Sequence, residues 1–138
     1  MIRAYGDQTY TPKLHIGSGV TVTGGFKLLC ADSISIGDDT LFGSDVFISD
    51  ENHGMRSLDD AYAKQPLQTK KVNIGNNCWI GERAIILPGA AIGEWSIIGA
   101  GAVVAGNIPP RSIVVGNPGK IIKRFDLDSN EWKRMEEK

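Results

Sequence analysis

From Ile74 onward the sequence repeats every six residues. Six consecutive blocks each open on an aliphatic residue: IGNNCW, IGERAI, ILPGAA, IGEWSI, IGAGAV and VAGNIP. Glycine follows that residue in four blocks, and the fifth position is Cys, Ala or Ser until Ile108 breaks the pattern. An amphipathic helix would repeat its apolar residues every three or four positions, and this much glycine would destabilise it. The period therefore predicts short extended segments joined by tight turns.

The first half of the chain repeats the pattern less regularly. Two runs of apolar residues keep the spacing of six, namely Ile16, Val22 and Leu28, then Ile36, Phe42 and Ile48. Leu28 and Ile36 are eight residues apart, so two extra residues interrupt the phase between the runs. Hexapeptide repeats of this kind form parallel β-helices, in which stacked coils bury one continuous core. A β-sandwich with glycine-rich turns is the alternative, and six blocks in phase favour the β-helix.

Composition limits the partners of such a fold. The 138 residues include 17 glycines and only 7% aromatic residues, which suits a narrow aliphatic core. A net charge of -1 gives no reason to expect nucleic acid as a partner. The chain has no apolar run long enough to span a membrane, and its first residues lack the apolar stretch of a secretory signal. Two cysteines outside any zinc spacing indicate no metal site, and a reducing cytoplasm is the expected location.

The repeat blocks resemble the hexapeptide-repeat acyltransferases. NIGNNCWIG, IIGAGAVVAGNIPP and IVVGNPGKIIKRF are similar to segments of the galactoside, maltose and polysaccharide O-acetyltransferases, and the resemblance covers residues 16–125. It implies a left-handed, triangular β-helix that assembles into homotrimers with sites between subunits. We therefore expect a single all-β domain with five parts: an N-terminal segment (1–15), β-helix coils (16–48 and 72–118), an extended loop (49–71) and a C-terminal segment with a short helix (119–138).

The repeat disappears between Ile48 and Val72. The intervening SDENHGMRSLDDAYAKQPLQTKK is polar and contains Gly54 and Pro66, and the chain then rejoins the repeat in phase. A long loop that projects from a regular scaffold is commonly functional. A histidine in a surface loop needs no function, but in the resembling acetyltransferases the catalytic histidine lies early in this loop. His53 has that position.

Imidazole suits the reaction that the resemblance implies, the direct transfer of an acetyl group from acetyl-CoA to a hydroxyl. A neutral imidazole with a pKa of about 6.5 serves as a general base at physiological pH, and such a base contributes about 10²–10⁴-fold to a rate. The other histidine, His15, precedes the first repeat and has no motif around it. Asp32, Asp50 or a backbone carbonyl are the candidates to hold the tautomer of His53.

The resemblance places the acetyl-CoA site on the later coils and the C-terminal segment, at Trp79, Gly81, Gly99, Ala100, Ala105, Lys120 and Lys123. In the family a tryptophan lies beside the pantetheine groove, and small residues let the pantetheine arm approach the backbone. Basic residues lie near the nucleotide phosphates. A backbone amide near Gly81 and Glu82 is the expected donor to the oxyanion of the reaction.

The acceptor is expected near Thr23 and Asn52. The galactoside and maltose enzymes use an asparagine on an early coil, and counting back from the IGDD block puts Thr23 at that position. The longer N-terminal segment that helps to bind sugar in those enzymes is also absent from this sequence. These departures favour another hydroxyl, such as one on a polysaccharide precursor.

The last residues, DLDSNEWKRMEEK, predict a short helix. Asp128 is a possible N-cap with Glu131 three residues later, and Trp132 and Met135 would share one face. We expect this helix to close the last coil or to dock on a neighbour, without a role in the chemistry.

Other functions remain open at this point. The γ-class carbonic anhydrases use the same repeat, but a zinc site of that kind takes three imidazoles and the chain has two histidines. A non-catalytic β-helix scaffold has no need of a polar loop that holds a histidine. Serine acetyltransferases normally carry a large helical N-terminal region, which this sequence lacks. An N-acetyltransferase of an amino sugar or antibiotic remains an alternative, because a histidine base serves both acceptors.

Overall fold

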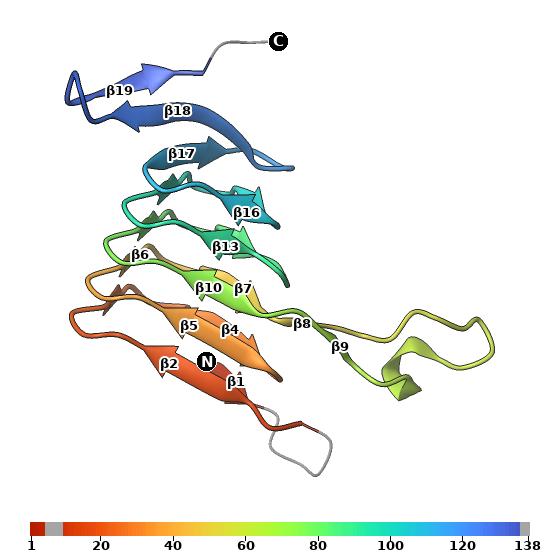
Figure 1. The fold of residues 1–138 in the computed structure, drawn as a ribbon. Coiled ribbons are helices and arrows are strands. Elements are labelled where there is room, and N and C mark those ends of the chain that lie inside the picture. Colours follow the sequence, from red (N-terminus) through yellow and green to blue (C-terminus); the bar gives the residue numbers. More distant parts are fainter. Residues whose placement is uncertain (5–9, 136–138) are drawn as a thin grey trace.

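The protein is a three-sided parallel β-helix (Figure 1). The computed structural model describes residues 1–4 and 10–135. Short strands stack coil upon coil into three sheets, which we call faces 1, 2 and 3, and the chain passes through them in that order in every coil. One long loop projects sideways from the stack (Figure 1).

Each face is a ladder of short parallel strands. Face 1 consists of β1 (Ile2–Ala4), β4 (Lys27–Cys30), β7 (Phe47–Ser49), β12 (Ile85–Ile86) and β15 (Val103–Val104). Face 2 consists of β2 (Lys13–Ile16), β5 (Ser33–Ile36), β10 (Val72–Ile74), β13 (Ala91–Ile92) and β16 (Asn107–Ile108). Face 3 consists of β3 (Thr21–Val22), β6 (Leu41–Phe42), β11 (Trp79–Ile80), β14 (Ile97–Ile98) and β17 (Ser112–Val115), and is extended by β18 (Lys120–Asp126) and β19 (Glu131–Arg134).

The six-residue phase is confirmed by the core. Ile36, Ile74 and Ile92 stand one above the other on face 2, in register, and all three are buried. The small fifth-position residues are buried beside such residues, as at Ala84 and Ala90. Burying this column of aliphatic side chains supplies the main stabilisation, at about 25 cal/mol for each Å² of apolar surface removed from water.

The first coil departs from the expected burial. Ile16 and Val22 pair in register with Ile36 and Phe42, as the phase predicts. Their side chains are nevertheless 41% and 48% exposed. They lie in the lowest rung of faces 2 and 3, where no strand among the described residues pairs on their other side. The N-terminal segment also joins the ladders, since β1 and β2 begin before residue 16.

All variation in coil length falls at the corner between faces 1 and 2, which we call the 1–2 corner. Successive inward residues are six positions apart across the other corners. Across the 1–2 corner the interval varies from coil to coil. It is regular from Ile86 to Ile92, two residues longer from Leu28 to Ile36 and two residues shorter from Val104 to Ile108. From Ile48 to Ile74 it contains the loop. Ile108, which breaks the sequence pattern, therefore takes the regular position above Ile92.

The loop consists of a short two-stranded ladder at its base and an outer part, residues 53–67, which we call the arm. β8 (Glu51–Asn52) and β9 (Gln68–Thr69) pair antiparallel at its base, and one 3₁₀ turn, η1 (Tyr62–Lys64), lies further out. The Gln65 side chain closes the outer part: its amide donates to the Ser57 carbonyl at 2.9 Å and accepts from the Arg56 amide at 3.1 Å.

The prediction of a short C-terminal helix is wrong. Within the described residues β18 pairs antiparallel with β17, and β19 pairs antiparallel with β18. Phe125 and Trp132 meet across this hairpin with ring centroids 5.3 Å apart. Asp128 lies in the turn between the strands and caps no helix. The described chain has no helix long and apolar enough to cross a membrane.

Candidate active site

His53 is the first residue beyond the ladder at the base of the loop. Asn52, the last residue of β8, pairs with Gln68 of β9 and so fixes where the next residue begins. The imidazole is exposed. His53 and Asn52 line a hollow of about 270 Å³ together with residues of face 1 and its edge: Leu29, Phe47, Ser49, Glu51, Leu87 and Pro88.

A second hollow, of about 450 Å³, lies where face 3 meets the corner that leads to face 1. It gathers most of the residues expected to bind donor and acceptor: Thr23, Trp79, Gly81, Gly99 and Ala100. Trp79 is 52% exposed, so its ring is available to a ligand or to another chain. His53 is not among the lining residues, and the two hollows share none. Within one chain, the expected base and most of the expected donor-binding residues therefore lie in two separate hollows.

The backbone amides of the second hollow are not equally available. The Gly81 amide donates to the Ile98 carbonyl at 2.7 Å, as a rung of the coil. The next amide, that of Glu82, has no partner within the part of the chain that the structure describes. The Thr23 hydroxyl donates to the Phe42 carbonyl at 3.0 Å, which leaves its oxygen able to accept. Of the two amides, Glu82 thus offers the free donor.

The remaining expected donor residues lie outside both hollows. Ala105 is exposed at the 1–2 corner above the loop. Lys120 is the first residue of β18 and is exposed, and Lys123 faces Ile113 across the β17–β18 pair. The structure therefore groups the two lysines on one strand. Ala105 lies two residues beyond Val103, whose carbonyl accepts from the Gly119 amide at 2.8 Å, one residue before Lys120.

Comparisons with known proteins identify the repeat. A family model described as bacterial transferase hexapeptide (six repeats) matches residues 71–106. WbbJ of Escherichia coli K12, assigned to lipopolysaccharide biosynthesis as an O-acetyl transferase, is 37% identical over 110 residues, which are 75% of this chain and 56% of WbbJ. The galactoside O-acetyltransferase of the same organism is 30% identical over 118 residues, 86% of this chain and 57% of the enzyme. The chain spans a little over half the length of these curated relatives.

Solved structures agree in fold along nearly the whole chain. A maltose O-acetyltransferase from Clostridium difficile 630 has a TM-score of 0.76 and 30% identity, covering 91% of this chain and 67% of that protein. The chain belongs to the hexapeptide-repeat transferases. A second member, from Vibrio cholerae and complexed with acetyl coenzyme A, has a TM-score of 0.75 at 26% identity, covering 91% of this chain and 65% of that protein. Membership also settles the handedness, because the fold of this family is the left-handed β-helix.

The loop of this hexapeptide-repeat transferase is anchored by a residue whose role the sequence did not reveal. Asp50 is fully buried, and its carboxylate accepts hydrogen bonds from the amides of Ala31, Asp32 and Ser33, each at 2.8 Å. Within the described residues, no hydrogen bond joins this carboxylate, Asp32 or a backbone carbonyl to the His53 imidazole. In the sequence, the sign of this contact was the pair of extra residues between Leu28 and Ile36, which lengthens the corner that the Asp50 carboxylate contacts.

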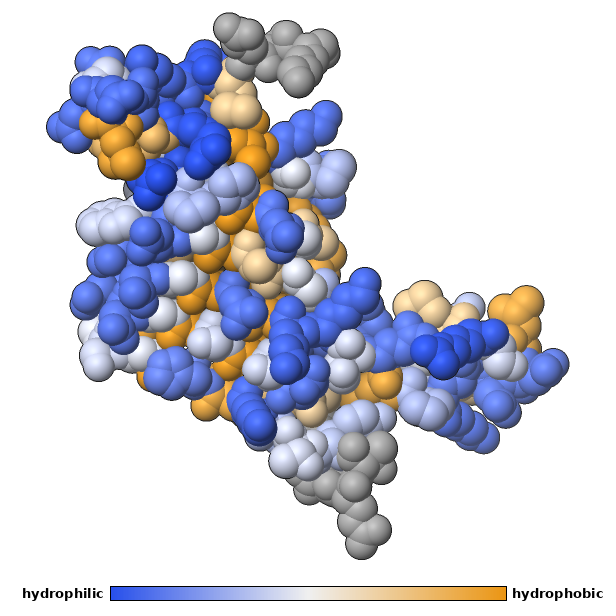
Figure 2. All heavy atoms as spheres, viewed as in Figure 1, coloured by the Kyte–Doolittle hydropathy of each residue, from blue (hydrophilic) through white to orange (hydrophobic). Residues whose placement is uncertain are grey.

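The three faces of the transferase differ in what they present to the outside. Outward residues on face 3 form an apolar row of Leu41, Trp79, Ile97 and Ile113. On face 1 the row is Phe47, Ile85 and Val103. On face 2 it is Ser35, Asn73, Ala91 and Asn107, which are small or polar. On the side seen in Figure 2, hydrophilic and neutral residues are interspersed with hydrophobic ones over the coils.

Proposed function

We propose that the protein is an acetyl-CoA-dependent O-acetyltransferase that acts on a hydroxyl of a sugar or polysaccharide precursor, with His53 as general base. The observation that carries this proposal is the pair of half-sites, a loop histidine in one hollow and the donor-site residues in another. The names of the relatives favour a hydroxyl acceptor, because both WbbJ and the galactoside enzyme are O-acetyltransferases.

In the proposed reaction His53 removes the proton of the acceptor hydroxyl as its oxygen attacks the thioester carbonyl of acetyl-CoA. The carbonyl π electrons move onto oxygen, and the Glu82 amide stabilises that oxyanion. When the carbonyl re-forms, the carbon–sulfur bond breaks, and the imidazolium returns its proton to the leaving thiolate. The products are the acetyl ester and coenzyme A, and no acyl-enzyme is formed.

Small residues explain how a thin donor would fit the second hollow. Gly99 and Ala100 have little or no side chain, so one wall of the hollow consists mainly of backbone. The pantetheine arm would lie between this wall and the exposed ring of Trp79. Lys120 and Lys123 would meet the nucleotide phosphates with Ala105 nearby on the last coil. Thr23 in this hollow and Asn52 beside His53 would contact the acceptor.

A trimer would unite the half-sites. The apolar rows on faces 1 and 3 are suited to burial against other chains, whereas face 2 is suited to solvent. The loop carries exposed apolar side chains far from the stack, among them Met55, Leu58 and Tyr62, and Figure 2 shows hydrophobic residues at the end of the arm. Docked on a neighbour, the loop would bring His53 of one subunit to the Gly99 wall of the next.

The test of the chemistry uses acetyl-CoA with a panel of acceptors: a galactoside, maltose, a sialic acid oligomer and glucosamine, followed by free-thiol release. His53→Ala should lower kcat by about 10²–10⁴-fold with the fold intact. His15→Ala is the matched control, because His15 is the other histidine and is also exposed. Normal turnover by His53→Ala would refute the proposed base, and preference for glucosamine nitrogen would refute the hydroxyl acceptor.

The test of the shared site mixes two inactive chains. His53→Ala and Ala100→Trp should each be inactive alone, but co-expressed they should form trimers with some sites free of both lesions. Recovered activity supports a site between subunits. An active monomer in light scattering under assay conditions contradicts it.

A further inference from the structure

The root of the loop contains a buried carboxylate that the proposed reaction does not use. Asp50 is 0% exposed, and among the described residues no cation lies within ion-pair distance of it. An isolated buried charge is strongly unfavourable unless hydrogen bonds compensate for the lost water. Here the compensation comes mainly from the backbone: Oδ1 accepts from the Ala31 amide, and Oδ2 accepts from the amides of Asp32 and Ser33. The Cys30 thiol is a further donor to Oδ2, at 3.7 Å.

The two extra residues between β4 and β5, in the second coil, create this cradle. Three successive amides that converge on one anion form a nest, which a regular corner of the β-helix does not offer. Ala31 and Asp32 lie at the 1–2 corner, one coil below the point where the loop leaves, because Leu29 pairs with Ser49. The insertion in one coil and the aspartate in the next therefore fit each other as a pair.

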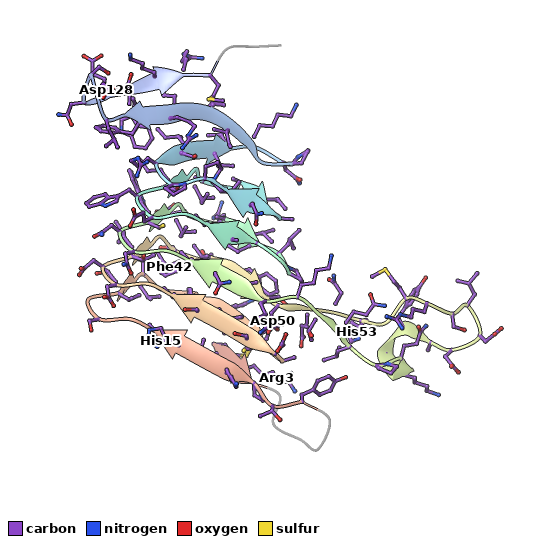
Figure 3. All side chains as sticks on the ribbon, viewed as in Figure 1. Arg3, His15, Phe42, Asp50, His53 and Asp128 are labelled. Atoms are coloured by element: carbon purple, nitrogen blue, oxygen red, sulfur yellow. The ribbon has the colours of Figure 1, made fainter. Side chains whose placement is uncertain are left out.

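The backbone of Asp50 also forms hydrogen bonds, both to the coil below and to the returning end of the loop. Its amide donates to the Leu29 carbonyl at 3.3 Å, and its carbonyl accepts from the amide of Lys70, where the loop returns, at 2.9 Å. From there the β8–β9 ladder runs two residues outward to Asn52, and His53 follows. Figure 3 shows Asp50 where the loop leaves the coils and His53 further out along it.

We propose that Asp50 is a positioning residue, which clamps the root of the loop onto the Ala31–Asp32 insertion and thereby sets the place of His53. The proposal rests on the proposed role of His53 as base. A side chain with one acceptor would satisfy the nest only in part, since an asparagine amide would present hydrogens to amides that are themselves donors. The clamp matters for rate because a displacement of about 1 Å in a catalytic group lowers turnover by up to about 10²-fold.

The decisive experiment is a double-mutant cycle of Asp50→Asn and His53→Ala, with the acceptor that the wild type turns over fastest in the panel above. Asp50→Asn should lower kcat by about ten-fold or more and change the acetyl-CoA KM by less than about two-fold. In the His53→Ala background the same change should alter the residual rate by less than about two-fold, because the group it positions is gone. An equal loss in both backgrounds would overturn the proposal, and a fully active His53→Ala would overturn the base itself.

Asp38→Asn is the matched control for the cycle. The Asp38 carboxylate accepts one backbone hydrogen bond, from the Ser18 amide at 2.9 Å, at a corner that does not lead to the loop. It should leave kcat within about two-fold of the wild type. A loss equal to that of Asp50→Asn would show a general effect of removing corner carboxylates and would overturn the proposal.

Two further measurements need no acceptor. The chain has only two histidines, so the imidazole carbon-bound proton signals of His53 and His15 are separable by NMR. Asp50→Asn should shift or broaden the His53 signal and leave His15 unchanged, and an unmoved His53 signal overturns the proposal. If Asp50→Asn does not fold, hydrogen exchange on the wild type decides: the amides of Ala31, Asp32, Ser33 and Lys70 should be as protected as those of the repeat core. Fast exchange at these four amides would refute the clamp.

Discussion

The stacked coils and the loop are held together by different groups. In the coils, backbone amides donate repeatedly to carbonyls of an adjacent coil, as from Gly75 to Ile92 at 2.8 Å. In the loop beyond the β8–β9 pair, side chains take this role: Gln65 closes the outer part, and the Tyr10 hydroxyl accepts from the Leu67 amide at 2.9 Å. The coils therefore depend mainly on residue size at the inward positions, whereas the loop depends on particular polar side chains.

The difference also separates stability from activity. Coil residues bury apolar side chains in one continuous column, so a disruptive substitution in one coil lowers the stability of the whole fold. The loop contributes few buried apolar contacts: among residues 50–71 of the described chain, only Asp50 and Gly54 are buried. Changes in the loop should therefore alter turnover far more than the free energy of unfolding, and changes in the coils should do the reverse.

The largest effect is expected from a charge placed inside the coils. Ile74→Asp should destabilise the protein by more than about 4 kcal/mol, because Ile74 is buried and its surroundings offer an aspartate no partner. Its neighbour in the same strand, Asn73, is exposed, and Asn73→Asp should change the free energy of unfolding by no more than about 0.5 kcal/mol. Urea unfolding of the two variants measures the difference, and equal stability of both would contradict the six-residue phase.

A smaller loss is expected from a methyl group at a tight corner. A Cβ on Gly81 would lie 2.7 Å from the Ala100 nitrogen and 2.8 Å from the Ile98 oxygen, both backbone atoms that cannot move aside independently. Gly81→Ala should therefore destabilise by about 1–3 kcal/mol. At Gly24 a Cβ would meet nothing within 4 Å, so Gly24→Ala should melt at or slightly above the wild-type temperature. A Gly81→Ala protein that melts like Gly24→Ala would show that the corners tolerate more than the backbone contacts indicate.

In the loop the expected effect moves from stability to dynamics. Gln65→Ala removes the hydrogen bonds to the Arg56 amide and to the carbonyls of Ser57 and Asp60. Chymotrypsin should cut the loop at Tyr62 several times faster, while the melting temperature stays close to that of the wild type. Lys64→Ala, an exposed neighbour, is the control and should leave the cleavage rate unchanged. A large fall in melting temperature for Gln65→Ala would mean that the loop supports the coils after all.

The smallest expected effect lies where the two regions meet. Burial, followed by the negative charge of Asp50, raises the pKa of the Cys30 thiol to about 11. The pKa of an unfolded thiol is about 8.5, so the unfolded state binds fewer protons than the folded state between these two pH values. The contribution of this group to stability is therefore complete below about pH 8.5 and is lost as the pH rises towards 11. Urea midpoints between pH 7 and 10.5 should fall more steeply for the wild type than for Cys30→Ala, and parallel curves would contradict this origin.

Much of the fold was predictable because the geometry of a β-helix imposes a regular spacing on the residues of the chain. Each inward position recurs after six residues, and so the phase, the loop and the place of His53 within it all follow from the spacing of residues along the chain. The C-terminal hairpin does not. Trp132 and Met135 have a spacing that suits a helix face, but β17 offers an unpaired strand edge, and pairing with that edge outweighs the weak helical preference of the segment.

The sequence by itself determined which residues face inward in each coil, because the inward position recurs at a fixed period of local spacing. Only the tertiary structure decided what meets across coils. It placed every irregular interval at one corner, and it set the buried carboxylate of Asp50 against three amides from a coil almost twenty residues earlier. It also put His53 and most of the residues proposed to bind the donor in separate hollows of one chain. Such contacts join residues that are distant in the sequence, and no periodicity records them.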